Sequence, residues 1–244
     1  MDWKMFVLYN GVHYREAIEE SIANSKIYEN VGFVTKREQP TEVVVADMKT
    51  LDAALEYKEG KTCVLNFASF KNPGGGFLKG AVAQEEYLCQ NSTLYNVLSK
   101  FPAYYEKNRL DTNDALYWNR AIYSPGIVML PSETKVDVLS CAAPNIRASR
   151  MVDSKKVQAV ISRIKFVLDI LEKEECDTVI LGAFGCGVFG NDPRFVARTF
   201  CSQGVLCRGF KKVIFAIPNS KSVNHRAFKE VYNKLKELVD SMLG

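Results

Sequence analysis

The sequence predicts an α/β sandwich, in which helices cover both faces of a central sheet. Short apolar runs typical of buried strands alternate with segments of helical periodicity along the whole chain, and this alternation is typical of α/β folds. Two of the strand-to-helix connections are rich in glycine. No repeat, low-complexity tract or linker composition interrupts the 244 residues, so one domain over residues 1–244 is expected.

Six segments are expected before residue 120. Ala17, Ile18 and Ile22 share one side of an amphipathic helix over residues 13–28. Residues 101–120 are polar and aromatic without a clear period, so a long loop is expected that forms either a wall of the functional site or a surface insertion. The segments between them are a strand at 43–46, a helix at 50–57, a strand at 64–67 and a helix at 80–98, to which Val82 contributes an apolar side chain.

The second half of the chain continues the alternation of strands and helices. A strand at 121–130 is interrupted by Pro125 and Gly126, the two residues that most often break local structure. The segments that follow are a strand at 136–143, a helix at 155–173, a strand at 178–181, a helix at 193–203, a strand at 213–217 and a helix at 225–243.

Composition argues against several classes of protein. The formal net charge of +4 is scattered, so it does not identify a nucleic-acid-binding surface, although it is compatible with an anionic ligand. With 7 cysteines, mostly in apolar runs, and 2 histidines, His13 and His225, neither a metal site nor another cofactor is expected. There is no secretion-signal pattern, and no apolar run approaches the roughly 20 residues of a membrane span. We therefore expect a cytoplasmic monomer that does not enter a membrane.

The stretch from Asn72 to Glu86 contains the first glycine-rich connection. Gly74, Gly75 and Gly76 follow an expected strand and precede an expected helix, with Glu85 and Glu86 near the start of that helix. Consecutive glycines let a ligand approach the backbone closely, and amide groups beside a helix N-terminus suit an anion. The alternative is a tight turn in which the carboxylates only complement the helix dipole.

The second glycine-rich connection runs from residue 182 to residue 190. The spacing of Gly185, Gly187 and Gly190 matches the dinucleotide fingerprint between a strand and a helix. No acidic residue lies between residues 199 and 217, where a ribose-binding acid would be expected, and this disfavours a nicotinamide-dependent oxidoreductase. The loop is still expected to hold a diphosphate. Cys186 has no histidine close in sequence, so it is not expected to act as a nucleophile.

Three consecutive glycines, seven residues and Gln-Glu-Glu resemble the signature of the poly(ADP-ribose) glycohydrolases, in particular their bacterial-type branch of the macrodomain superfamily. The resemblance extends from about residue 13 to the C-terminus. It implies a three-layer α/β/α sandwich with a mixed, macrodomain-like central sheet and an N-terminal helical extension over about residues 1–40. Other segments that resemble the family are 66–69, 123–125, 141–145 and 185–192.

The resemblance also implies roles for individual residues. Glu86 is the expected general acid and base, Glu85 holds the distal ribose hydroxyls, and Gln84 orders the loop. Phe189 presses on the distal ribose, unless it only packs in the core as Phe184 is expected to do. The remaining substrate-binding candidates are Asn72, Gly74, Gly75, Gly76, Gly185, Cys186, Gly187, Val188, Gly190, Asp47 and Asn145.

Two of these candidates, and Ser69 with them, have a structural alternative. Asp47 is expected to read the adenine amino group, but it could equally cap the helix that follows it. Asn145 and Ser69 are either ribose contacts or turn residues.

The expected reaction is hydrolysis of the ribose–ribose O-glycosidic bond of poly(ADP-ribose), with ADP-ribose as the product. Because Glu85 and Glu86 are adjacent on a helix, their side chains are expected to diverge by about 100° and not to flank one bond, which leaves the proton transfers to a single glutamate. Two alternatives stay open: a hydrolase that removes single ADP-ribose units from modified protein or nucleic acid, and a module that binds ADP-ribose without cleaving it. The second acid argues against simple binding.

Overall fold

A computed structural model describes the backbone of residues 2–32 and 41–243. Its strands form one sheet in the order β1-β4-β5-β3-β6-β7-β2, in which β4 runs antiparallel to both β1 and β5 and the other neighbours are parallel. The sheet is therefore mixed, as expected. The strands are β1 (Lys26–Tyr28), β2 (Glu42–Ala46), β3 (Thr62–Phe67), β4 (Ala121–Met129), β5 (Thr134–Cys141), β6 (Thr178–Leu181) and β7 (Lys212–Ala216).

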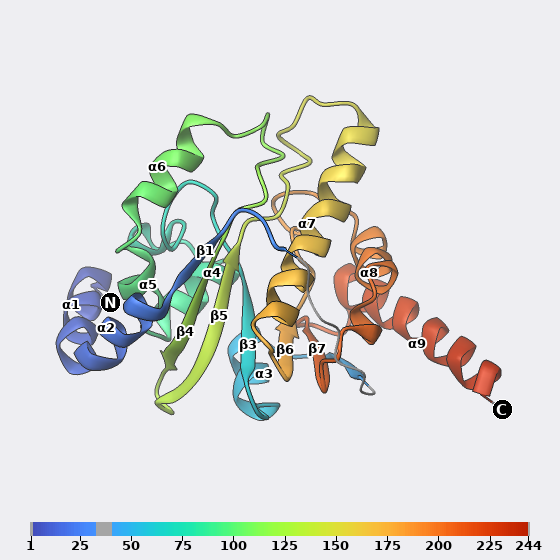
Figure 1. Cartoon of the computed structure of the whole chain (residues 1–244), viewed down its shortest axis with the longest axis horizontal. Helices are drawn as coiled ribbons and strands as arrows, with labels where there is room; N and C mark the ends of the chain where they lie inside the picture. The colour runs from blue at the N-terminus through green and yellow to red at the C-terminus, as the bar shows by residue number, and fades with distance from the viewer. Residues whose placement is uncertain (1, 33–40, 244) are drawn as a thin grey trace.

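Helices cover both faces of this sheet, which confirms the predicted sandwich (Figure 1). The first face is covered by α7 (Asp153–Lys173), α8 (Pro193–Ser202) and α9 (Val223–Leu243). The second face is covered by α1 (Trp3–His13), α2 (Arg15–Asn24), α3 (Thr50–Glu56), α4 (Gln84–Gln90), α5 (Leu94–Leu98) and α6 (Pro102–Leu110). Two 3₁₀ turns, η1 (Phe77–Lys79) and η2 (Val205–Cys207), complete the described elements.

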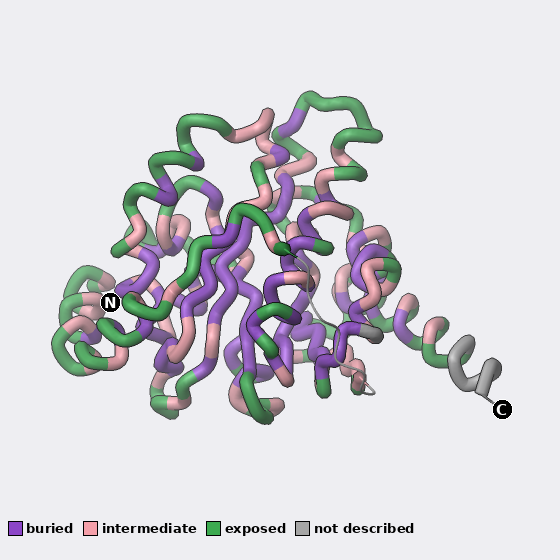
Figure 2. The backbone as a smooth tube through the Cα atoms, in the orientation of Figure 1, coloured by how far each residue is buried: buried purple, intermediate pink, exposed green. Residues whose placement is uncertain are grey.

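The central strands are apolar on both sides because both sides face helices. In β3, Cys63 and Leu65 pack in the cluster beneath α7, whereas Val64 packs in the cluster on the opposite face. Continuous apolar runs are typical of strands that are covered on both faces. Figure 2 shows the result as a buried central sheet within a more exposed outer layer of helices.

The helix predicted over residues 80–98 is wrong. After η1 the range begins with a segment that is not helical, in which Val82 is 84% exposed, and only its later part forms the two short helices α4 and α5. Thr93 causes the second interruption, since its amide donates to the Val128 carbonyl while its hydroxyl oxygen accepts from the Val128 amide. These bonds join the segment to β4, so tertiary pairing overrides the local helical pattern.

The N-terminal segment is more than a helical extension. The helix predicted over residues 13–28 is correct only for α2, because the chain then forms β1, which pairs along β4 with Lys26 opposite Tyr123. The last part of the predicted extension, residues 33–40, lies outside the described residues.

Two other predictions for irregular segments are confirmed in part. The expected 101–120 loop contains α6 before it becomes irregular, and the break at Pro125 and Gly126 is a shift of register within β4. Within the described residues, no helix is long and apolar enough to cross a membrane.

Candidate active site

A cleft of about 670 Å³ opens at the carboxyl ends of β2, β3, β6 and β7. Parallel strands bring their following loops to one edge of a sheet, which is where ligands of open α/β folds bind. The lining of the cleft joins segments that are far apart in sequence: 49–50, 82–84, 187–189 and 216–218.

Gln84 fastens the start of α4 to the end of β3. Its Oε1 accepts the Phe67 amide at 2.8 Å, and its Nε2 donates to the Leu65 carbonyl at 2.9 Å and to Thr50 Oγ1 at 3.3 Å. An amide side chain can satisfy a strand end in this way because it carries both a donor and an acceptor. Gln84 therefore orders the start of this helix, which places the two glutamates that follow.

Glu85 is buried at the end of β3. Its Oε2 accepts the Ser69 amide at 2.7 Å, and its Oε1 accepts Asn66 Nδ2 at 3.3 Å. Burial raises the pKa of the Glu85 carboxyl to about 8, although these hydrogen bonds favour its charged form. At neutral pH the carboxyl group is thus largely protonated, and it can donate as well as accept a hydrogen bond.

Glu86 lies beside Glu85 in space as well as in sequence. Its Oε1 accepts the Gly76 amide at 2.8 Å. A Cβ atom placed on Gly75 would lie 2.4 Å from this oxygen and 3.0 Å from Glu85 Oε2. The prediction that the two side chains diverge is therefore wrong, because hydrogen bonds to Ser69 and to Gly76 bend both carboxyl groups toward Gly75.

The first glycine loop is organised around these carboxyl groups. The Gly75 amide donates to the Asn72 carbonyl at 3.2 Å, and the Gly76 amide donates to Glu86. Gly74 and Gly75 have φ values of 66° and 59°, which suit glycine. The expected phosphate cradle is thus filled by acceptors of the chain itself, and contact of Asn72 and the three glycines with a ligand stays a prediction.

The second glycine loop presents free backbone donors. Within the described part of the chain, no acceptor reaches the amides of Gly187, Val188 and Phe189. Asn191 fixes the loop, since its Nδ2 donates to the Gly185 and Pro144 carbonyls at 3.0 and 2.9 Å. Successive free amides form a concave site that suits an anion.

The N-terminus of the helix after this loop is capped by a residue of the chain itself. Asp192 caps α8, because its Oδ1 accepts the Phe195 amide at 2.7 Å. A carboxylate therefore already occupies the helix N-terminus, so the loop amides are the donors left for a ligand. In the same loop, the Cys186 amide donates to the Ala183 carbonyl and the Gly190 amide to the Gly187 carbonyl.

Aromatic side chains connect the cleft with the irregular loop after α6. Phe189 lines the cleft, and its ring contacts that of Tyr117 edge-on at a centroid distance of 6.1 Å. Tyr117 also stacks on Phe70 at 4.4 Å. Phe184 is buried beside Phe67, which confirms its packing role. Sequence reasoning missed Tyr117, and its only signal was an aromatic residue within a polar loop.

The side chains of Asp47 and Asn145 each accept a hydrogen bond from a backbone amide of the chain. Asp47 is exposed at the end of β2, and its Oδ2 accepts the Ser220 amide at 2.9 Å. The capping alternative for Asp47 is wrong, because Lys49 is the N-cap residue of α3. Asn145 Oδ1 accepts the Ala148 amide at 3.1 Å, as a turn residue does. Ligand contacts of Asp47 and Asn145 stay predictions.

Two kinds of chemistry find little support in this site. Burial raises the pKa of the Cys186 thiol to about 12, the opposite of an activated nucleophile. Within the described residues, no group of three or more His, Cys, Asp or Glu side chains is placed to hold a metal ion.

Gln84, which directly precedes the two converging carboxyl groups, lines the same cleft as the free amides suited to a diphosphate, and this arrangement is typical of a hydrolase that acts on a glycosidic bond of a sugar nucleotide. Residues 5–131 match the family model of the microbial-type PARG catalytic domain, where PARG is poly(ADP-ribose) glycohydrolase. The chain belongs to this family, and the resemblance found in its sequence is confirmed.

Solved structures support the family and the fold. The glycohydrolase of Thermomonospora curvata is 32% identical over 88% of each chain, with a TM-score of 0.79. A second structure of that protein, bound to the inhibitor ADP-HPD, is 31% identical over 88% of each chain, with a TM-score of 0.75. The Deinococcus radiodurans glycohydrolase in complex with ADP-ribose is 32% identical over 89% of this chain and 98% of its own, with a TM-score of 0.77. A comparison with curated protein sequences finds no match.

Proposed function

We propose that this chain hydrolyses the ribose–ribose O-glycosidic bond of poly(ADP-ribose) and releases ADP-ribose. The observation that carries the proposal is the convergence of Glu85 and Glu86 on Gly75 at the edge of a nucleotide-sized cleft. The relatives from the two bacteria bind ADP-ribose and ADP-HPD, and both ligands suit a cleft of this kind.

The substrate lies across the cleft in a macrodomain-like arrangement. The free amides of Gly187, Val188 and Phe189 hold the diphosphate, and the Phe189 ring supports the distal ribose. The adenine lies toward the ends of β2 and β7, where Asp47 is held by Ser220. This orientation places the anomeric carbon of the distal ribose toward the two glutamates.

Glu86 transfers the protons. As an acid it protonates the departing oxygen while the glycosidic bond breaks through an oxocarbenium-like transition state, and as a base it then takes a proton from the attacking water. The Gly76 amide fixes Oε1, and within the described residues no donor reaches Oε2, which is left for the substrate. Glu85, held by Ser69, binds the ribose hydroxyls and does not transfer the proton.

The first test compares the wild type with Glu86→Gln in the release of ADP-ribose. Both proteins are given poly(ADP-ribose) and, separately, a mono-ADP-ribosylated protein. We expect the variant to lose at least about a hundredfold in polymer turnover, as removal of a general acid does, and to keep its affinity for ADP-ribose in calorimetry. Undiminished turnover by Glu86→Gln would refute the role of Glu86.

The same assay separates the alternative functions. Cleavage of the mono-modified protein alone would make the chain a mono-ADP-ribosyl hydrolase. Binding of ADP-ribose by the wild type without turnover of either substrate would make it a binding module.

We also propose a cytoplasmic, monomeric enzyme in which residues 1–244 form one domain. Integration of β1 into the sheet favours a single domain. Cys63, Cys89, Cys141, Cys176, Cys186 and Cys201 are free thiols, which suits a reducing compartment.

A further inference from the structure

A second cavity, of about 640 Å³, lies beside the active-site cleft and has nearly the same volume. Its walls are the irregular loop 113–120, the first turns of α7 and the residues after β1. Tyr117 belongs to this lining, and its ring contacts Phe189 in the wall of the active-site cleft. The contact between Tyr117 and Phe189 thus links the linings of the two spaces.

Tyr117 also links the second cavity to the segment that holds Glu85. Its ring stacks on Phe70, and the preceding residue, Ser69, donates its amide to Glu85. These two contacts connect the lining of the second cavity with the residues that hold Glu85.

The loop that lines the second cavity has a disfavoured backbone that hydrogen bonds hold in place. Four of its residues have positive φ values, which residues other than glycine seldom adopt. These values are 48° at Asn113, 48° at Asp114, 64° at Ala115 and 60° at Tyr117. The Asp114 carboxylate accepts the Ser149 hydroxyl and the amides of residues 150 and 151 at 2.7–3.1 Å, which joins the loop to the neighbouring turn (Figure 1). Strain that is maintained in this way is typical of binding sites.

Trp118 is a fixed aromatic surface in this cavity. Its Nε1 donates to Asp111 Oδ2 at 2.9 Å, yet the residue is 45% exposed. The buried Arg163 holds the adjacent backbone, since it donates to the Tyr117 carbonyl at 3.1 Å and to Asn119 Oδ1 at 2.8 Å. An indole that is ordered without ligand suits stacking by a nucleobase.

The charge of the lining suits an anionic ligand. Lys155, Arg120 and Arg163 contribute three cationic groups, and Glu29 contributes the one carboxylate. That carboxylate is already paired with Lys107 at 2.6 Å and Arg120 at 3.7 Å. In the part of the chain that the structure describes, Lys155 makes no ion pair, so its ammonium group is available to a phosphate.

We propose that this second cavity binds the ADP-ribosyl unit on the leaving-group side of the bond that is cleaved, with its adenine on Trp118 and its diphosphate at Lys155. The inference rests on the proposed function. In poly(ADP-ribose) the leaving unit is attached through its adenosine ribose, so its adenine is the first base beyond the cleaved bond. The enzyme then binds the polymer on both sides of the bond that is cleaved.

The test measures binding in the Glu86→Gln background, which prevents turnover. Calorimetry compares ADP-ribose with a purified two-unit oligomer of poly(ADP-ribose). We expect the oligomer to bind at least about tenfold more tightly, and Trp118→Ala to remove most of this gain, since one base–aromatic stack is worth roughly that factor. Affinity for ADP-ribose alone is expected to stay the same.

Three further variants complete the test. Trp118→Phe is expected to restore most of the gain, because the ring and its stacking are kept. Lys155→Gln, at an exposed position, is expected to weaken oligomer binding about threefold and to reduce its dependence on salt. Tyr9→Ala, at an exposed aromatic position on α1, is expected to change neither affinity.

The possible outcomes separate the two proposals. If the oligomer binds no more tightly than ADP-ribose, or if the gain survives both Trp118→Ala and Lys155→Gln, the second site is refuted while the active-site proposal stands. If ADP-ribose itself does not bind, the proposed function fails, and the second site fails with it.

Discussion

Glu85 shows how a single side chain makes stability depend on pH. Its pKa is about 8 in the folded protein because the carboxyl group is buried, against an ordinary value of 4.5. A raised pKa of this kind means that the proton stabilises the folded state. The contribution is complete below about pH 4.5 and is lost as the pH rises to about 8.

We predict that Glu85→Gln stabilises the protein at alkaline pH. The uncharged amide avoids the burial of a charge, so the advantage over the wild type grows from near zero at pH 5 to a few kcal/mol at pH 9, at roughly 1.4 kcal/mol for each unit of pKa. Denaturant unfolding at pH 5, 7 and 9 measures this difference. Glu106→Gln, at an exposed position, is the control, and an equal pH profile for the two variants would contradict the prediction.

Gly75 determines where the two carboxyl groups can lie. Its φ of 59° disfavours any other residue, and an added Cβ would lie 2.4 Å from Glu86 Oε1. We predict that Gly75→Ala lowers kcat by at least about tenfold, because displacement of a positioned catalytic group by an ångström is enough for such a loss. Steady-state release of ADP-ribose measures the effect.

Gly80→Ala separates backbone strain from the contact with the glutamates. Gly80 also has a positive φ, 79°, but nothing lies within 4 Å of an added Cβ. The strain of the positive φ is expected to destabilise the fold by about 1–2 kcal/mol in both variants, and only Gly75→Ala is expected to lose activity. Equal losses of activity would show that strain, and not the position of the carboxylates, is responsible.

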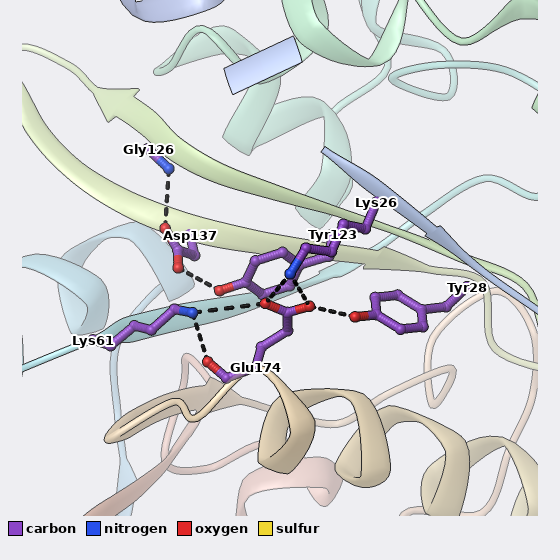
Figure 3. A network of polar contacts seen from close by, with 7 residues as sticks. All are labelled: Lys26, Tyr28, Lys61, Tyr123, Gly126, Asp137 and Glu174. Atoms are coloured by element: carbon purple, nitrogen blue, oxygen red, sulfur yellow. Dashed lines mark hydrogen bonds and ion pairs between the residues drawn. The ribbon is translucent and has the colours of Figure 1, made fainter. Parts of the chain in front are cut away.

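At the scale of elements, one carboxylate joins β1 to the end of α7 and to the residue before β3. Glu174, directly after α7, accepts the Tyr28 hydroxyl and Lys26 Nζ from β1, and Lys61 Nζ lies 3.7 Å from its Oε2 (Figure 3). Burial alone would raise the pKa of this carboxyl group, but the bonds from Tyr28 and Lys26 outweigh burial and lower it. The network stabilises a strand of three residues, which is too short to be stable alone.

We predict that Glu174→Gln lowers the free energy of unfolding by about 1–3 kcal/mol, since it removes a buried charge that accepts the hydroxyl of the buried Tyr28 and pairs with Lys26. The melting temperature should fall by several degrees. The matched control is Glu175→Gln, because that neighbouring side chain is exposed. Equal melting temperatures for the two variants would mean that the network contributes nothing to stability.

Elements that depend on neighbouring residues could be predicted from the sequence, whereas elements that depend on contacts between distant residues could not. The strands at 64–67 and 178–181 were predicted because burial on both faces leaves a local apolar signature. β1 was missed, since only Tyr28 of its three residues is buried and its partner is β4. The long helix was wrong because Thr93 bonds to β4, a contact that no local pattern reveals.

The same limit applies to the site. Glu85 and Glu86 were found because they stand in one short motif with the glycines. Their convergence was not predicted, because it depends on hydrogen bonds that the amides of Ser69 and Gly76 donate. Tyr117 was missed because its contact with Phe189 in the cleft wall depends on tertiary packing.

At the scale of the whole molecule, the sheet fixes the order in which the fold can be completed. Both of its edges come from the first 46 residues: β1 pairs with β4, with Lys26 opposite Tyr123, and β2 pairs with β7, with Glu42 opposite Lys212. During synthesis the two edge strands emerge first, and their partners emerge later. Each edge strand stays unpaired until its partner strand has been synthesised. This topology therefore favours slow folding and exposes the nascent chain to aggregation.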